Sequence, residues 1–474
     1  MVSDWKPQFK RYPHFDKDIS GANIEALVHN PSRVAENSFF PFLRYSKSYQ
    51  PFRSKISGKP PRKNRPLRYA SRRDAYIFSY YRHLLSAPYE ALLKAEGLSD
   101  TVLAYRKIPE PTGGGKSNIQ FARDAFQNVR LLGTCTVATL DIGSFFECID
   151  HARLGNLWCR LLGVSSLPPD HAAVFKAVTQ YAVVDREAAY ERLGYLRREV
   201  IHGRERLAYT TSYDDMPRQL CSMKDFREKI CGKGGEWPTL IESARENWGI
   251  PQGSPISDLL ANLSLIEFDR SMREHCENVG GSYLRYSDDI MLIVPGEVSK
   301  CLALCDLARV EIALSGDKLR FKDSKTRVVG FRPGVDRQSC FNADSQVPTN
   351  GLEYLGFRFD GRSVYLRDST VARLHRKIAG GVKAACAEMV ARYPGRDAAY
   401  VISRFDFGRF LERFGRVEDF DPHGNFDGWT FWTYARRAMT VFGPVGRPIA
   451  VQLRKYKTAV RSRVGKEIVR RLAK

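Results

Sequence analysis

Two adjacent carboxylates, Asp288 and Asp289, interrupt an apolar segment that reads GSYLRYSDDIMLIVPG over residues 281–296. Strand-like residues on both sides predict a hairpin whose tip carries the two acids. Neighbouring anions repel each other and resist burial, so they need a compensating positive charge. Ser-Asp-Asp is also ordinary turn composition, which leaves a simple solvated turn as the alternative.

A third carboxylate, Asp141, favours chemistry over a simple turn. It ends the apolar segment CTVATLD, which has the pattern of a strand and is followed by a helical pattern. If this strand pairs beside the hairpin, three carboxylates converge, and the backbone carbonyl of Ile142 adds another oxygen. Hard oxygen ligands of this kind bind Mg²⁺ and leave positions for water and phosphate oxygens. Two such ions about 4 Å apart would activate a 3′-hydroxyl and stabilise a departing pyrophosphate.

The charge of the chain favours a polyanionic partner. Its 474 residues include 75 Lys and Arg against 53 Asp and Glu, a formal net charge of +22, and 43% are hydrophobic. This balance predicts a globular protein of two or three domains that binds nucleic acid rather than a membrane surface. No apolar run approaches the length of a membrane-spanning helix, and no signal peptide follows Met1. Ten cysteines without a C-x-x-C pair favour a reduced, cytoplasmic protein.

The elements that would position these acids follow from hydrophobic periodicity. Residues 74–97 predict an amphipathic helix that ends at Gly97, and residues 153–248 are expected to be mostly helical with a polar insertion near 203–236. A turn at WGIPQGSP opens another helix that leads into the hairpin. A helix over 298–316, strands over 352–366 and a basic helical region beyond 370 complete the pattern. The first fifty residues give no assignment.

Several segments, taken in order, resemble motifs of one enzyme family. LDIGSFF, GIPQGSPISDLLANL, RYSDDI, DSKTRVVGF and EYLGFRF occur in that order along the chain. They are similar to the first catalytic strand, the Pro-Gln-Gly signature, the Tyr-x-Asp-Asp box, the lysine motif and the primer grip of reverse transcriptases. The basic segment of residues 51–73, with nine Lys or Arg and no acid, resembles the fingers motif of group II intron-type enzymes.

The resemblance implies an α+β right-hand polymerase with fingers, a palm made of an antiparallel sheet backed by helices, and a mainly helical thumb. We expect an N-terminal extension (1–50), fingers (51–136), a palm (137–366) with an insertion near 153–248, and a basic thumb with an RNA-binding C-terminal region (367–474). It also implies two Mg²⁺ ions, with Mn²⁺ as a substitute.

The resemblance also implies a role for each matching residue. The catalytic acids and metal ligands are Asp141, Asp288 and Asp289, with Ile142 as a further metal ligand. Nucleotide-binding residues are Lys63, Arg65, Phe145, Phe146, Gln252, Gly253 and Lys325. Primer- and template-binding residues are Tyr286, Ser287, Leu355 and Gly356. The ring of Phe146 would clash with a 2′-hydroxyl and so select deoxynucleotides, whereas Phe145 is the better candidate for core packing. The fingers match departs from the family at Ala70 and Ala75, so a basic loop that contacts template backbone is the alternative for Lys63 and Arg65.

The C-terminal residues 447–474 hold ten Lys or Arg and one acid. On a helix, Arg454, Lys457 and Arg461 would share one face and grip an RNA duplex, while Leu453 and Tyr456 face another direction. A charged tail that only keeps the protein soluble is the alternative.

Three other signals do not predict sites. PTGGGKSN resembles a P-loop, but Glu110 occupies the position of the first glycine that a P-loop requires. We therefore expect this segment to be a Gly-rich fingers loop that touches nucleic acid. The pair Asp214 and Asp215 lacks apolar flanks and is expected at the surface. His151 has no second ligand at metal spacing and is expected at a helix start.

The segment AYRK at residues 104–107, the serine of the Tyr-Ser-Asp-Asp box and the long insertion resemble the bacterial "unknown group" and abortive-infection enzymes. The resemblance implies an RNA-templated DNA polymerase that acts in anti-phage defence. Its expected partners are a structured noncoding RNA, a DNA product and dNTPs, and the enzyme can also form a homo-oligomer. The alternatives are a retron-like or group II intron-like enzyme, an RNA-dependent RNA polymerase, and an RNA-binding scaffold that retains a polymerase fold.

Overall fold

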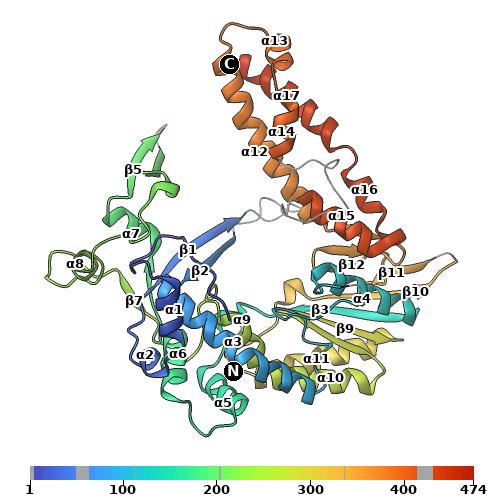
Figure 1. The fold of residues 1–474 in the computed structure, drawn as a ribbon. Helices are drawn as coiled ribbons and strands as arrows, with labels where there is room; N and C mark the ends of the chain where they lie inside the picture. The colour runs from blue at the N-terminus through green and yellow to red at the C-terminus, as the bar shows by residue number, and fades with distance from the viewer. Residues whose placement is uncertain are drawn as a thin grey trace.

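The computed structural model describes residues 5–49, 63–111, 113–201, 204–335, 337–413 and 431–473. A five-stranded sheet lies at the lower right of the view in Figure 1, with an N-terminal part to its left and a helical C-terminal part rising above it. We refer to these parts as the palm, the fingers and the thumb. The basic stretch of residues 51–62 lies outside the described residues.

The palm contains a five-stranded antiparallel sheet in the order β11-β10-β3-β9-β8. Its inner strands are β3 (Cys135–Asp141), β9 (Asp289–Pro295) and β10 (Arg327–Pro333), and its edges are β8 (Ser282–Tyr286) and β11 (Gln338–Asn342). The hairpin β8–β9 was expected, and its turn carries Ser287 and Asp288. Because β9 pairs with β3 along its whole length, the apolar segments found in the sequence become neighbouring central strands.

Both faces of this sheet are buried, which explains the nearly continuous apolar runs of its central strands. On β9, Ile290, Leu292 and Val294 join a core that includes α9 (Ser257–Ser264), α10 (Ile266–Asn278) and α11 (Val298–Leu314). Met291 and Ile293 join a second core with α4 (Asn118–Leu132) and the thumb. Side chains alternate between the faces of a strand, so Asp289 and Asp141 both lie on the face toward α4.

The fingers contain a second sheet, ordered β2-β1-β4-β7, and the 24-residue helix α3 (Arg72–Ala95). Strand β1 (Phe42–Tyr49) pairs antiparallel with β2 (Lys63–Tyr69) and parallel with β4 (Ala182–Asp185), which pairs with β7 (Ile241–Ser243). Strand β1 lies in the expected N-terminal extension (1–50) and its partner β2 lies in the expected fingers (51–136), so the two regions share one sheet. Helices α1 (Gly21–Val28) and α2 (Pro31–Ala35) lie in the expected N-terminal extension, where they pack against each other and against α3 and α6 (Pro169–Thr179).

The expectation that residues 153–248 are mostly helical is wrong beyond Thr179. Helices α5 (His151–Leu162) and α6 (Pro169–Thr179) are followed by β4, the short helix α7 (Arg186–Arg192) and a separate hairpin of β5 (Leu196–Ile201) and β6 (Arg204–Tyr209). A further helical segment, α8 (Met223–Asp225) and η3 (Phe226–Ile230), precedes β7. The β5–β6 hairpin is largely exposed, so its sequence lacks the apolar alternation that reveals a half-buried strand.

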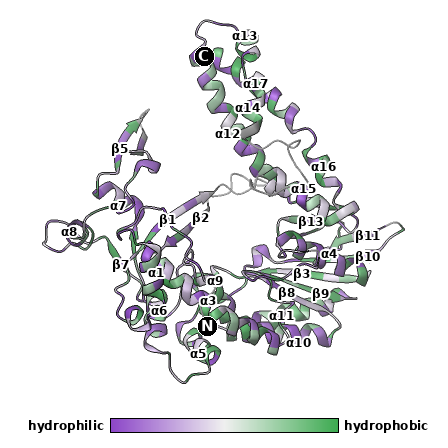
Figure 2. Cartoon of the chain, viewed as in Figure 1, coloured by the Kyte–Doolittle hydropathy of each residue, from purple (hydrophilic) through white to green (hydrophobic). Residues whose placement is uncertain are grey.

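A small sheet of β12 (Leu352–Tyr354), β13 (Phe357–Phe359) and β14 (Val364–Leu366) ends the expected palm, and the thumb follows as helices. The long helix α12 (Asp368–Arg392) packs along α17 (Tyr456–Leu472), and both alternate hydrophilic and hydrophobic segments (Figure 2). Between them lie α13 (Ala398–Ser403), α14 (Phe407–Arg413), α15 (Phe431–Phe442) and α16 (Pro448–Leu453). The expected single helix around Arg454 is wrong, because Arg454 and Lys455 separate α16 from α17.

Two further features match the sequence. No helix among the described residues is long and apolar enough to cross a membrane. All ten cysteines are free, and six of them are buried.

A buried ion pair fixes β8 against α9 and α10. Arg285 and Asp269 are both fully buried, and the Arg285 guanidinium makes two contacts with the Asp269 carboxylate, at 2.5 and 2.6 Å. The Tyr283 hydroxyl donates to the same carboxylate at 2.6 Å, and Arg285 also donates to the Asn262 side-chain oxygen at 2.9 Å. One buried polar network therefore joins β8 to both α9 and α10.

We predict that Asp269→Ala lowers the free energy of unfolding by about 3–5 kcal/mol, because it leaves Arg285 buried without its counter-ion. Chemical denaturation measures this change. Asp306→Ala is the matched control, since it removes an aspartate that pairs with Arg309 at the surface, and it should cost no more than about 1 kcal/mol. Equal effects of the two substitutions would contradict the assignment of a buried network.

Candidate functional site

The strand register brings two of the three predicted acids together. Asp141 is the direct partner of Asp289 in the β3–β9 pairing. Asp288 lies in the turn before β9, and its carbonyl accepts a hydrogen bond from the Ile142 amide at 3.0 Å. Ile142 is fully buried. The backbone thus places all four predicted metal-site residues at one end of the sheet.

Two lysines supply the positive charge that the acids require. Lys322 donates to Asp141 Oδ1 at 3.0 Å, and Lys325 makes a short contact with Asp141 Oδ2. Both come from the segment that ends in the short helix η4 (Asp323–Lys325), and this segment is held beside β3 because the Lys322 amide donates to the Asp141 carbonyl. Within the described ranges, no three acidic, histidine or cysteine side chains are arranged to hold a metal ion.

The surroundings of Asp289 disfavour its ionised form. Asp289 reaches the open side of the sheet end but is surrounded by protein atoms, and this desolvation together with Asp288 and Asp141 raises the pKa of its carboxyl to about 6. Lys325 opposes the shift. Ionised Asp289 therefore costs stability in the free protein, as expected for carboxylates that serve a bound cation.

A cavity of about 480 Å³ joins the fingers to this end of the palm sheet. It brings together Arg65, Phe145, Phe146, Gln252, Asp288 and Lys325 from the sequence predictions. Phe145 is buried in the core, whereas Phe146 is only partly buried. Tyr105 and Lys322 also line the cavity and were missed. Neither residue carries a local sequence signal, because Lys322 contacts Asp141 and Tyr105 contacts Ser287 across long sequence separations.

Lys63 is the first residue of β2, two positions before Arg65. Its side chain lies outside what the structure describes. Arg65 is exposed and lies opposite Lys47 in the β1–β2 pairing, so the strand carries positive charge toward the cavity.

The Pro-Gln-Gly turn is held against the fingers by its backbone. The Arg68 amide of β2 donates to the Gln252 carbonyl at 2.9 Å. Gly253 has φ +117°, and a Cβ there would overlap the Arg68 carbonyl, so only glycine allows this approach. Gly249 has φ +91° and lies close to the Glu147 carbonyl. The hydroxyl of Ser257 donates to the Pro251 carbonyl at 2.8 Å and closes the turn.

The predicted primer-side residues line the face toward α4. Tyr286 is the direct partner of Asp289 in the β8–β9 pairing, and its ring lies 6.1 Å from that of Phe121. Leu355 and Gly356 form the turn between β12 and β13 with φ values of 46° and 93°. The Asn118 amide of α4 donates to the Leu355 carbonyl at 3.0 Å and to the Tyr434 hydroxyl of α15 at 2.9 Å. Asn118 thus ties the turn to both palm and thumb.

The predicted basic face of the C-terminus is only partly assembled. Arg454 lies in the break between α16 and α17, whereas Lys457 and Arg461 lie on α17. Arg454 and Lys457 line a groove of about 400 Å³ beside α15, and Arg461 lies over the Phe407 ring. Leu453, Tyr456 and Val460 are buried, as expected.

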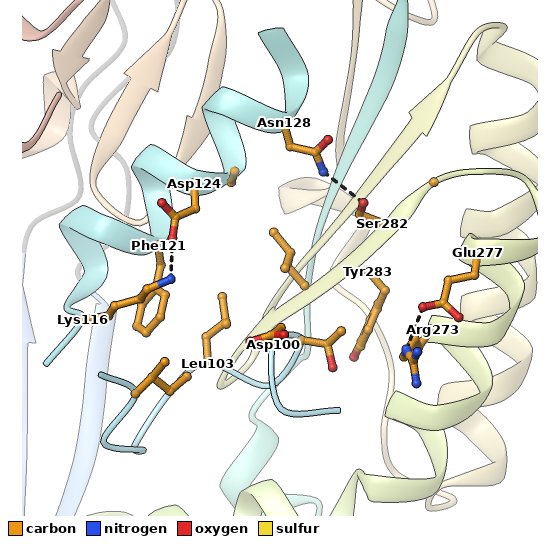
Figure 3. Close-up of a pocket in the computed structure, with 15 residues that line it drawn as sticks. Asp100, Leu103, Lys116, Phe121, Asp124, Asn128, Arg273, Glu277, Ser282 and Tyr283 are labelled. Carbon is orange, nitrogen blue, oxygen red and sulfur yellow. Dashed lines mark hydrogen bonds and ion pairs between the residues drawn. The ribbon is translucent and has the colours of Figure 1, made fainter. Parts of the chain in front are cut away.

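Another cavity, of about 350 Å³, lies where α4, α10 and the edge strand β8 meet (Figure 3). Six of its charged and polar side chains form three pairs: Lys116 with Asp124, Arg273 with Glu277, and Asn128 with Ser282. Lys116 is the lysine of the Gly-rich segment, and Ser117 beside it caps α4. These contacts favour a structural role for a segment that was expected to touch nucleic acid.

The positions predicted for the Asp214–Asp215 pair, at the surface, and for His151, at a helix start, agree with the structure. Asp214 and Asp215 are exposed on the short helix η2 (Tyr213–Asp215). His151 begins α5, and its ring lies 2.7 Å from the Gly249 carbonyl, so it supports the Pro-Gln-Gly turn.

Comparison with known families gives the decisive observation. Residues 226–359 match the model of the family described as reverse transcriptase (RNA-dependent DNA polymerase). Residues 226–359 therefore resemble a reverse transcriptase domain. The match includes the Pro-Gln-Gly turn, the Asp288–Asp289 hairpin and Lys325, and it begins after Asp141 and the fingers. The fold class is that of a right-hand polymerase, with an antiparallel palm sheet backed by helices.

Solved telomerase structures are similar to the chain at low identity. Apo telomerase from Candida tropicalis is 11% identical with a TM-score of 0.39, over 89% of this chain and 64% of that chain. A form truncated from its C-terminal domain gives 10% identity and a TM-score of 0.39, over 68% of this chain and 55% of that chain.

The Candida albicans telomerase in complex with a fragment of telomeric RNA is 11% identical with a TM-score of 0.35, over 93% of this chain and 63% of that chain. The chain spans less than two thirds of the length of these structures. A search of curated proteins found no match to the chain.

The raised pKa of Asp289 gives a pH-dependent prediction for the reverse transcriptase domain. An aspartate whose pKa is about 6 in the folded state and about 3.9 when unfolded destabilises the fold as pH rises between these values. Asp289→Asn should therefore raise the free energy of unfolding above pH 6, by about 1 kcal/mol because solvent screens the partly exposed group. Below pH 4 the gain should vanish. Denaturant titrations without divalent metal at pH 4 and pH 7.5 measure it, and a gain of equal size at both would contradict the charge-based account.

Proposed function

We propose that this protein is an RNA-templated DNA polymerase that extends a primer with deoxynucleotides. The observation that carries the proposal is the pairing of Asp141 with Asp289, next to Asp288, at a cavity that the fingers complete with Arg65. The reverse transcriptase domain supports the same reaction.

The chemistry of the side chains suits a hard divalent cation, because Asp141, Asp288 and Asp289 offer carboxylate oxygens at one end of the sheet, although the three are not gathered around one point. The raised pKa of Asp289 supports this interpretation, since it reflects burial of the carboxyl beside Asp288 and Asp141. When bound, Mg²⁺ would lower the barrier to phosphoryl transfer by stabilising negative charge on the attacking and leaving oxygens. Mn²⁺ offers similar coordination and is the expected substitute.

The chain's own residues would orient the substrates around these acids. Arg65 and Lys325 are cationic groups that line the cavity and would bind the triphosphate. Gln252 lies in the turn held to β2, where it would contact the nucleotide or the templating base. Tyr286, Ser287 and the Leu355–Gly356 turn would support the primer terminus.

The net charge of +22 supports an RNA partner, and the basic residues of the thumb support contacts with a duplex backbone. We further propose that the template is a structured noncoding RNA and that the enzyme acts in anti-phage defence. The support for this finer assignment is the AYRK segment, the Tyr-Ser-Asp-Asp box and the insertion that contains the β5–β6 hairpin.

Primer extension tests the reaction directly. The purified protein with Mg²⁺, an RNA template, a DNA primer and the four dNTPs should yield template-dependent extension. Asp288→Asn should abolish extension, a loss of about a thousandfold or more in rate, without lowering thermal stability, because it removes a charge but keeps the side-chain shape. Asp214→Asn is the matched control, from a pair of adjacent acids that the structure places at the surface. RNA binding without extension by the wild type on any template would instead favour the scaffold alternative.

Phe146 distinguishes a DNA polymerase from an RNA polymerase. Its partly buried ring lines the nucleotide cavity, so Phe146→Ala should raise ribonucleotide incorporation relative to deoxynucleotides by about tenfold or more. Single-nucleotide addition with matched dNTP and NTP pairs measures the ratio. Phe146→Tyr keeps the ring and should keep the discrimination. An unchanged ratio in Phe146→Ala would place the selection at another residue.

A further inference from the structure

Ser287 holds an unusual backbone conformation directly before the catalytic Asp288. Its φ of 60° lies in the left-handed region, and its side chain is only 5% exposed. Non-glycine residues there are strained and persist only where neighbouring groups hold them. The contacts of Ser287 therefore decide where Asp288 lies.

One of these contacts comes from the buried network beneath the sheet. Arg285 donates to the Ser287 carbonyl at 3.3 Å, while it remains paired with Asp269. Asp288, the next residue, accepts from the Ile142 amide. The carbonyl of the strained residue and the carbonyl of Asp288 are thus both held by hydrogen bonds within the protein.

The other contact comes from the cavity side. The hydroxyls of Tyr105 and Ser287 lie 3.1 Å apart and share a hydrogen bond. Tyr105 also has a positive φ, 64°, although it belongs to a different segment of the chain. Two strained non-glycine residues therefore meet, and Tyr105 also lines the cavity.

The backbone around Tyr105 is itself anchored to the palm. The Asn262 amide donates to the Ala104 carbonyl at 2.8 Å, and Arg82 donates to the Tyr105 carbonyl at 3.0 Å. Arg82 is in turn fixed by Asp258, with contacts of 2.8 and 2.9 Å. The backbone at Tyr105 is therefore held by side chains of the protein itself.

We propose that Tyr105 is a positioning residue for the catalytic turn, which holds Ser287 from the cavity side so that Asp288 keeps its place beside Ile142. This inference rests on the proposed function, since it assigns a role within nucleotide addition. Tyr105 acts through Ser287 in this role, so its hydroxyl affects the rate of addition and not the affinity for the incoming nucleotide.

Single-nucleotide addition kinetics test the role with Tyr105→Phe, Ser287→Ala and the double variant. Each single substitution should lower kcat by about five- to tenfold, the scale of one lost neutral hydrogen bond, and leave KM for the nucleotide within about twofold. The double variant should be no slower than either single variant, because all three lack the same bond.

Tyr209→Phe is the matched control. Tyr209 is 45% exposed and Tyr105 is 43% exposed, but Tyr209 lies on β6, away from the cavity. This variant should match the wild type. A wild-type rate in Tyr105→Phe would overturn the proposal, as would additive losses in the double variant. An increase in KM with unchanged kcat would also overturn it and would make Tyr105 a nucleotide contact.

Hydrogen exchange measured by mass spectrometry separates this proposal from the proposed function. In Tyr105→Phe, backbone amides of the peptide covering residues 282–295 should exchange faster than in the wild type and in Tyr209→Phe. This readout needs no polymerase activity. A wild type without nucleotide addition would defeat the proposed function alone, whereas unchanged exchange in Tyr105→Phe would defeat the positioning role.

Discussion

The ion pair between Arg285 and Asp269 is the constraint on which the catalytic end of the palm depends. Both charges are fully buried, so the free energy lost by removing them from water must be recovered within the protein. It is recovered because the remaining hydrogen-bonding groups are used: Asp269 also accepts from Tyr283, and Arg285 also donates to Asn262 and to the Ser287 carbonyl. One network therefore fixes two helices, the edge strand β8 and the turn that carries Asp288.

Much of this arrangement could be predicted from the sequence, because it depends on strand periodicity. The apolar alternation around Asp141 and Asp289 predicted two strands, and their pairing places the two acids opposite each other. The same periodicity carried a signal that was not used. Within YLRY, Tyr283 and Arg285 share a face, and a charged residue on a buried face requires a partner. Its identity as Asp269 could not be predicted, since that residue lies on a different helix.

The predictions that were wrong concern segments without a strong hydrophobic pattern. The β5–β6 hairpin has exposed side chains on both faces, so its arginines and glutamates did not distinguish a strand from a helix. The break at Arg454 and Lys455 is set by how α16 and α17 pack against the rest of the thumb, which local spacing does not encode. Lys322 is a long-range case, because its contact with Asp141 depends on the segment that follows α11 lying beside β3.

The two sides of the catalytic turn therefore differ in how freely their charges can rearrange. Beneath it, Arg285 and Asp269 have no access to solvent, so neither can move without leaving a buried charge unpaired. Above it, Lys322 and Lys325 have side chains that are 40% and 44% exposed, so they can leave Asp141 and be solvated at little cost. The turn is thus rigid where it must define the position of Asp288, and the counter-charge is exchangeable where a cation and a triphosphate would have to enter.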